Sequence, residues 1–176
     1  MARIITVGAG VQDVFLSQSD ALAPVCDSPE RCFAKLELGA KADVNQIHFS
    51  TGGGATNAAV TFARQGHEVM FMGVVGRDPA GQAVLDDLDA ENVDTRYVRF
   101  SQKYNTGYSV LLLAPNGERT ILTYRGASTH YHTADFTVVG VEADWLYVST
   151  LAGQMTVLDK VFREARAAGM KICFNP

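Results

Sequence analysis

The sequence predicts an α/β protein: a parallel sheet covered by helices, with a smaller β-sheet set apart from it. Short apolar runs typical of strands buried on both faces alternate along the chain with helical patterns. These apolar runs occupy residues 2–10, 68–76, 145–149 and 170–176. Four other segments have one apolar and one polar face, which favours a separate sheet exposed on one side: residues 32–38, 44–50, 107–113 and 119–124.

Three segments carry the apolar spacing of helices. Residues 54–65 repeat alanine and phenylalanine at helical intervals and stop at Gly66, a natural helix terminator. Residues 79–92 begin with a proline, which suits the first turn of a helix. Residues 154–169 form a long amphipathic pattern, so each strand-helix alternation supports a parallel sheet.

Turn residues predict the connections. Residues 115–118 (PNGE) join two apolar runs through an Asn-Gly pair, a strong hairpin signal. Residues 21–32 contain two prolines and are predicted to form a surface loop. We assign the α/β core to residues 1–10, 51–95 and 133–176, and the smaller sheet to about residues 11–50 and 96–126.

Composition excludes several classes of partner. Of the 176 residues, 47% are hydrophobic, which suffices for one domain with a core. The net charge is −4 with no basic stripe, so nucleic acid is a poor partner. The N-terminal run is too short for a signal peptide, and no run is long enough to span a membrane. Three cysteines without CxxC spacing favour a reduced setting, so we expect a soluble cytoplasmic protein.

The last apolar run, MKICFNP, stops where a central strand of an α/β sheet would reach its ligand-binding edge. A parallel sheet that stopped there would have an open apolar edge, which folded proteins usually cover or pair. We therefore expect the α/β layer to be incomplete at the C-terminus.

The first candidate site is the glycine run Gly52-Gly53-Gly54, which leads directly into a predicted helix. Unpaired amides and the positive end of the helix dipole point outward there, and a ligand can approach closely where no Cβ is present. Such a helix start binds anions or hydroxyl oxygens, and the carboxamide of Asn57 suits a polyol hydroxyl. The alternative is a tight turn whose glycines serve only the strand-to-helix geometry. A nucleotide P-loop lacks its lysine, because no lysine lies between Lys41 and Lys103.

The second candidate is VGAGVQD, residues 7–13. Its Gly-x-Gly after a strand favours a dinucleotide fingerprint, but Asp13 stands in place of the third glycine and no helical pattern follows. Alternatively, Asp13 just beyond the strand end accepts hydrogen bonds from sugar hydroxyls, or is a solvated loop residue.

Other polar residues are assigned structural roles. Asp78 precedes Pro79 and is placed to cap the helix that begins there. His130 and His132 have no third ligand at a suitable spacing, so the pattern favours a solvated loop and no metal site. No Ser-His-Asp arrangement follows from the spacing either.

In this order, the motifs resemble the N-terminal half of the ribokinase-like (PfkB) family of carbohydrate kinases. GGGATN followed by AAVTFARQG and then GVVGRDPAG is similar to the first signature of that family. VDTRYV, TGYSVLLL, NGERTI and RGAS are similar to its lid hairpin and the segment that follows, and FNP to a strand-end motif. The resemblance implies a Rossmann-like α/β core with a β-sheet lid, and it extends over essentially the whole chain.

The resemblance also implies roles for individual residues. Asp13 corresponds to an aspartate that holds sugar hydroxyls, while Gly53, Gly54 and Asn57 correspond to the glycine-rich sugar site. On one face of a single strand, Ser109 and Leu111 correspond to lid residues that close over the substrate.

Two residues depart from the pattern. Val11 stands where many sugar kinases have asparagine, which puts a simple ribose-type specificity in doubt. Arg119 stands where ribokinases tend to have asparagine; it either pairs with a phosphate or carboxylate of the substrate or only decorates the hairpin.

The family implies a kinase that uses Mg-ATP to phosphorylate a sugar or nucleoside. Its second signature, D-T-x-G-A-G-D, provides the catalytic aspartate and does not occur in this sequence. We therefore expect a substrate-binding half that has no catalytic residue, binds neither ATP nor Mg²⁺ alone, and is inactive as an isolated chain. A homodimer through the lid is expected. The alternatives are a non-catalytic sugar-binding or dimerisation module and, with less support, a dinucleotide-binding protein.

Overall fold

A computed structural model describes all 176 residues and divides into two units. Unit 1 comprises residues 1–12, 51–107 and 125–176, and unit 2 comprises residues 13–50 and 108–124. The boundary differs from the expected one at residues 96–107, which belong to unit 1. There β9 (Arg99–Ser101) pairs in parallel with β7 (Val74–Gly76), so a strand of unit 1 holds this segment.

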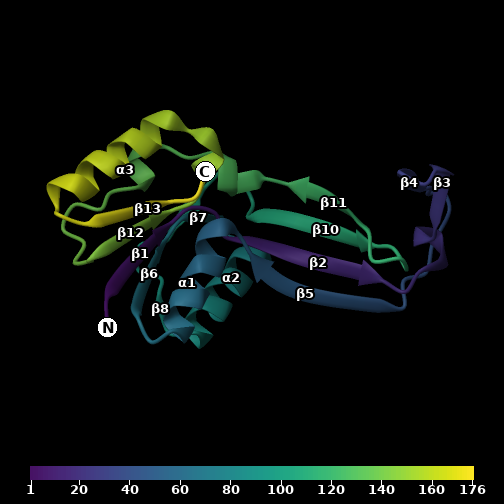
Figure 1. Ribbon diagram of the computed structural model, residues 1–176, viewed down its shortest axis with the longest axis horizontal. Helices are drawn as coiled ribbons and strands as arrows, with labels where there is room; N and C mark the ends of the chain where they lie inside the picture. Colours follow the sequence, from purple (N-terminus) through teal and green to yellow (C-terminus); the bar gives the residue numbers. More distant parts are fainter. The chain divides into compact units, whose positions relative to one another are not determined.

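Unit 1 is built on a five-stranded sheet whose four pairings are all parallel. Its strands, in spatial order, are β13 (Lys171–Phe174), β12 (Trp145–Val148), β1 (Arg3–Val7), β6 (Glu68–Met72) and β8 (Val93–Asp94) (Figure 1). The predicted parallel sheet is confirmed. β1 lies at its centre, so its carboxyl end is flanked by the ends of β6 and β12.

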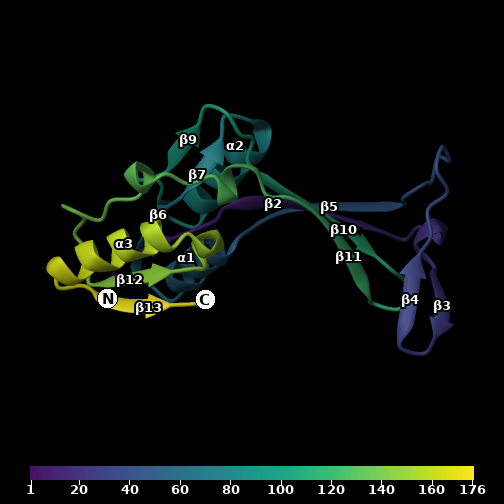
Figure 2. The same ribbon diagram turned by 90° about the horizontal axis from the view of Figure 1, so that it is seen from above.

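Helices cover both faces of this sheet (Figures 1 and 2). On one face, α1 (Gly54–Arg64) and α2 (Pro79–Ala90) bury a cluster that includes Val69 and Phe71. On the other face, α3 (Met155–Ala167) packs on a cluster that includes Ile5. Because alternate residues of a strand point to opposite faces, the continuous apolar runs supply both clusters. All three predicted helices are present, and none is long and apolar enough to cross a membrane.

Four short 3₁₀ turns complete the regular structure: Asp20–Leu22, Gly126–Thr129, Thr133–Asp135 and Leu151–Gly153. The last of these follows β12 and contains Leu151 and Ala152 in the left-handed region, at φ 46° and 55°. Non-glycine residues rarely adopt that conformation.

Unit 2 is built on a second sheet of four strands. Their order is β11 (Arg119–Tyr124), β10 (Gly107–Leu113), β2 (Val11–Ser17) and β5 (Gln46–Gly52). β10 and β11 form the predicted antiparallel hairpin, and its turn is closed by the amide of Glu118 donating to Asn116 Oδ1 at 3.1 Å. Gly117 has a φ of 87°, which explains the glycine after the asparagine.

A second hairpin in unit 2 corrects three predictions (Figure 2). Residues 21–32, predicted as a loop, form a 3₁₀ turn and then β3 (Pro24–Ser28), which pairs antiparallel with β4 (Arg31–Ala34). The strand predicted over residues 32–38 ends at Ala34. Cys26 and Cys32 are joined by a disulfide, so the expectation of three reduced cysteines is wrong for this pair. The two cysteines lie directly opposite each other across the hairpin, a proximity that a count of cysteines does not reveal.

Candidate binding site at the carboxyl edge of the unit 1 sheet

Within the glycine run, Gly53 adopts a backbone conformation that other residues rarely tolerate. Gly53 precedes the first residue of α1 with φ 118° and ψ 145°. A Cβ on Gly53 would lie 2.2 Å from the carbonyl oxygen of Ala9, and one on Gly54 would lie 2.9 Å from Ser149 Cβ. Both the positive φ and the close approach therefore require glycine at position 53.

Further glycines bring the neighbouring loops to the same place. A Cβ on Gly8 would lie 2.0 Å from Ser149 Oγ, and one on Gly73 would lie 2.6 Å from the carbonyl oxygen of Gly8. These residues directly follow β1 and β6, and Ser149 directly follows β12. The start of α1 thus packs against the carboxyl ends of the central strands, the edge at which open α/β sheets bind ligands.

Amides at the start of α1 have no capping side chain. Gly53 offers none, and the helix ladder begins with the amide of Asn57 donating to the carbonyl of Gly53 at 3.0 Å. The Thr56 hydroxyl points backward and donates to the carbonyl of Gly52 at 2.7 Å. The first amides of the helix thus remain available as donors, at the end where the helix dipole is positive.

Asn57 and the glycines lie together in unit 1. Gly52 is buried, Gly54 and Asn57 are exposed, and Asn57 lies in the first turn of α1. An exposed carboxamide beside free amides can both donate to and accept from a hydroxyl group. The glycine run and Asn57 thus lie at the same end of α1.

The other three predicted site residues lie in unit 2. Asp13, predicted just beyond the end of the first strand, is a half-buried residue within β2, so the alternative of a solvated loop residue is wrong. Ser109 and Leu111 are alternate residues of β10 and share one face, opposite Thr123 and Ile121 of β11. β2 and β10 are hydrogen-bonded neighbours, so all three residues belong to one sheet. Arg119 begins β11 and is exposed.

The Gly-x-Gly segment has no helix after it. The chain passes from β1 directly into the strand β2, whereas a dinucleotide fingerprint needs a helix whose N-terminus holds the pyrophosphate. Gly10 instead serves packing, because a Cβ there would lie 3.0 Å from Val84 Cγ1 and 3.1 Å from Thr56 Cγ2. The dinucleotide interpretation therefore loses its structural basis.

Asp78 caps α2, as predicted, and also binds the residue that precedes β10. Its carboxylate accepts from the Gly81 amide at 2.8 Å and from the Thr106 amide and hydroxyl, both at 2.7 Å. Burial raises the pKa of Asp78, but these hydrogen bonds outweigh it, first that of the Thr106 hydroxyl, and the pKa lies below its usual value. The second role was missed, because Thr106 is 28 residues away in the sequence.

Ser149 was also missed, since a single polar residue at the end of a strand forms no motif. His130, predicted in a solvated loop, stacks on Tyr104 with ring centroids 3.7 Å apart. No group of three or more His, Cys, Asp or Glu side chains is arranged to hold a metal ion.

A parallel sheet covered on both faces, with a glycine-rich helix start at its carboxyl edge, defines an α/β protein of the class that binds small molecules at this edge. A profile described as pfkB family carbohydrate kinase matches residues 23–175. The chain belongs to this family of carbohydrate kinases, as the motifs indicated.

Curated relatives agree with this assignment. The chain is 30% identical over 129 residues to a ribokinase of Haemophilus influenzae, and the match covers 71% of this chain and 42% of the relative. It is also 30% identical over 125 residues to the probable fructokinase-7 of Arabidopsis thaliana, covering 69% of this chain and 35% of the relative. The chain therefore spans less than half the length of these relatives.

Solved structures share the fold. A ribokinase from Cryptococcus neoformans, in complex with ADP, superposes with a TM-score of 0.74 at 21% identity, covering 100% of this chain and 50% of that one. A fructokinase from Xylella fastidiosa with bound ATP has the same TM-score at 21% identity, covering 98% and 51%. This likeness confirms the ribokinase-like α/β fold.

Proposed function

We propose that this chain is the substrate-binding portion of an ATP-dependent kinase that phosphorylates a hydroxyl group of a sugar or nucleoside. The free amides at the start of α1, around Gly53 and Gly54, form one side of the substrate site, and Asn57 holds a hydroxyl. The uncapped start of α1 carries this proposal, because its free amides and the positive end of the helix dipole lie where the closely packed glycine loops meet the carboxyl edge of the sheet.

The four-stranded sheet of unit 2 corresponds to the lid of the family and supplies the remaining contacts in this proposal. Asp13 on β2 accepts hydrogen bonds from substrate hydroxyls, and Ser109 and Leu111 on β10 close over the substrate. Lid closure excludes water from the reacting hydroxyl, as phosphoryl transfer requires. Relatives named ribokinase, fructokinase and aminoimidazole riboside kinase support a substrate in the range from free sugars to ribosides.

Phosphoryl transfer itself needs residues outside this sequence in our proposal. The D-T-x-G-A-G-D signature with the catalytic aspartate is absent from the sequence. We therefore assign the binding of ATP and Mg²⁺ and the catalytic base to a part of the kinase outside this sequence. We expect the isolated cytoplasmic chain to have no kinase activity.

Titration calorimetry of the 176-residue chain with ribose, fructose and a riboside tests substrate binding. We expect one of these to bind, and Asn57→Ala to weaken its affinity about tenfold, the effect of one hydrogen bond to a polar ligand. Gln65→Ala removes an exposed carboxamide at the other end of α1 and should leave the affinity unchanged.

Two results would contradict the proposal. Equal affinity of the Asn57 and Gln65 variants would remove α1 from the substrate site. Sugar-dependent ATP turnover by the isolated chain, measured by coupled ADP release, would show that the catalytic machinery is present after all.

A further inference from the structure

The β3–β4 hairpin of unit 2 is exposed on nearly all sides. Of its nine strand residues, only Pro24 and Phe33 are half-buried, and the others are exposed. The two strands form a sheet of their own, in which Cys26 and Cys32 are directly paired and joined by the disulfide. A bulge interrupts the pairing between Cys26 and Ser28.

Little besides the disulfide stabilises this hairpin. An isolated two-stranded hairpin is at best marginally stable in water, because it has no apolar face to bury. Apart from the pairing of its two strands, the hairpin contains an interaction between the guanidinium of Arg31 and the ring of Phe33, whose centre lies 5.1 Å away, and such an interaction is weak at an exposed position. The crosslink is therefore the main restraint on the folded hairpin.

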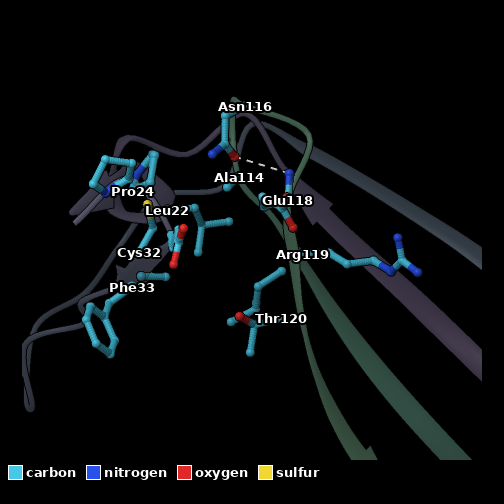
Figure 3. A pocket seen from close by; sticks show the side chains of 13 residues that line it. Leu22, Pro24, Cys32, Phe33, Ala114, Asn116, Glu118, Arg119 and Thr120 are labelled. Carbon is cyan, nitrogen blue, oxygen red and sulfur yellow. Dashed lines mark hydrogen bonds between the residues drawn. The ribbon is translucent and has the colours of Figure 1, made fainter. Parts of the chain in front are cut away.

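One wall of a cavity of about 360 Å³ is formed by this hairpin. Cys32 and Phe33 line one side, and Thr120 of β11 lies across from them, while Arg119 points away (Figure 3). Because one wall belongs to the hairpin and the other to the β10–β11 end, the cavity exists only while the hairpin keeps its place.

We propose that Cys26 and Cys32 form a reversible redox site, and that its reduction by a dithiol releases the β3–β4 hairpin and opens the cavity. A thiolate of the dithiol attacks one cystine sulfur, forms a mixed disulfide and expels the other cysteine as a thiolate. The second thiol of the reductant then displaces the first cysteine. Two electrons pass from the dithiol, which becomes a cyclic or intramolecular disulfide, and the two cysteines each end as thiols after protonation.

Access and reversibility both favour exchange at this site. Both cysteines are exposed, so a thiolate can reach either sulfur, and exposed disulfides are among the readily reduced ones. The loop between them is short, with a sequence separation of 6, so the two thiols remain close after reduction. Cys173 on β13 is a single exposed thiol in unit 1 and serves as an internal reference.

Hydrogen exchange with mass spectrometry, on the whole chain with and without dithiothreitol, tests the structural consequence. Reduction of the disulfide removes the crosslink that closes the loop. The hydrogen-exchange rate of the paired amides in residues 24–34 should then rise by up to roughly 50-fold, as expected for a loop of this length. Peptides from β1 and α3 should be unchanged. Cys26→Ser/Cys32→Ser should exchange rapidly in the hairpin without reductant, whereas Cys173→Ser should match the wild type.

Thiol counting by alkylation tests the chemistry. Under denaturing conditions, the oxidised chain should show one alkylatable thiol, and it should show three after dithiothreitol and one again after reoxidation. Three thiols in oxidised protein would overturn the disulfide, and a cystine that resists dithiothreitol would overturn its reversibility. Equal hairpin protection in both redox states would overturn the proposed release.

Discussion

Gly53 shows how one missing side chain defines the site. Its φ of 118° lies in a region that is almost closed to other residues, and the Ala9 carbonyl oxygen occupies the place of its Cβ. A side chain at position 53 would fit only if the loop after β1 moved away from α1. Conformation and space thus both restrict position 53 to glycine.

Gly53→Ala should therefore destabilise unit 1 by about 3–5 kcal/mol, from backbone strain together with overpacking. Gly66→Ala is the matched control at the other end of α1, because Gly66 has a φ of 83° with open space around its Cβ position. It should cost only about 1–2 kcal/mol, the penalty of the left-handed backbone alone. Urea unfolding followed by circular dichroism measures both. Similar losses for the two variants would show that the approach of Ala9 to Gly53 is not as described.

Not all of the site was visible in the sequence, and single residues show why. Gly52–Gly54 and Asn57 were found because they are contiguous with a strong helix pattern. Ser149 and Thr106 were missed because their importance comes from contacts with residues distant in sequence. No strand was predicted specifically over residues 11–17, and pairing within the unit 2 sheet places Asp13 in the strand β2.

Among the elements, those with dense apolar patterns were predicted well. The strands of the parallel sheet and the three helices follow from their apolar patterns, and local signals mark both ends of α1 and the start of α2. The β3–β4 hairpin has neither, since its residues are exposed and contain two prolines in or beside the strands. Its structure depends on a crosslink, which no periodicity reveals.

The start of α2 depends on Asp78, and this dependence should vary with pH. Asp78→Asn replaces an acceptor oxygen with an NH₂ group facing the Thr106 donors, so it should destabilise the chain by about 1–3 kcal/mol at pH 7. The folded-state pKa is lowered, so the stabilisation by the wild-type carboxylate is present above the unfolded-state pKa of about 4 and is lost as the pH falls through the folded-state value.

The difference in unfolding free energy between wild type and Asp78→Asn should therefore shrink as the pH falls below about 4. Asp89→Asn, an exposed position on the same helix, should change stability by less than about 0.5 kcal/mol. A difference that stays constant with pH would contradict the role of the Asp78 carboxylate.

Association between chains is expected through the sheet of unit 2. Leu122 and Tyr124 lie on the face of β11 opposite to that of Ile121, and their side chains are 57% and 50% exposed. Adjacent exposed apolar residues on a sheet favour contact with another surface. We propose that a second copy of the chain covers this face, which forms the lid homodimer.

Leu122→Lys should weaken this dimer more than tenfold, because a charge would be buried at the contact. Ile121→Lys introduces the same charge on the other face of the same strand and should leave association unchanged. Sedimentation velocity over a concentration series distinguishes the two. The dimer would be contradicted if the wild-type chain were monomeric at the highest concentration as well as after 100-fold dilution.

Backbone amide chemical shifts of the labelled 176-residue chain, titrated with ribose, fructose or a riboside, test the substrate site most directly. We predict that the largest changes fall on Gly53, Gly54, Ala55 and Thr56 and on the carboxamide of Asn57. The assignment of the substrate site to the start of α1 would be contradicted if saturable changes were confined to other parts of the chain and the signals of these five residues did not change.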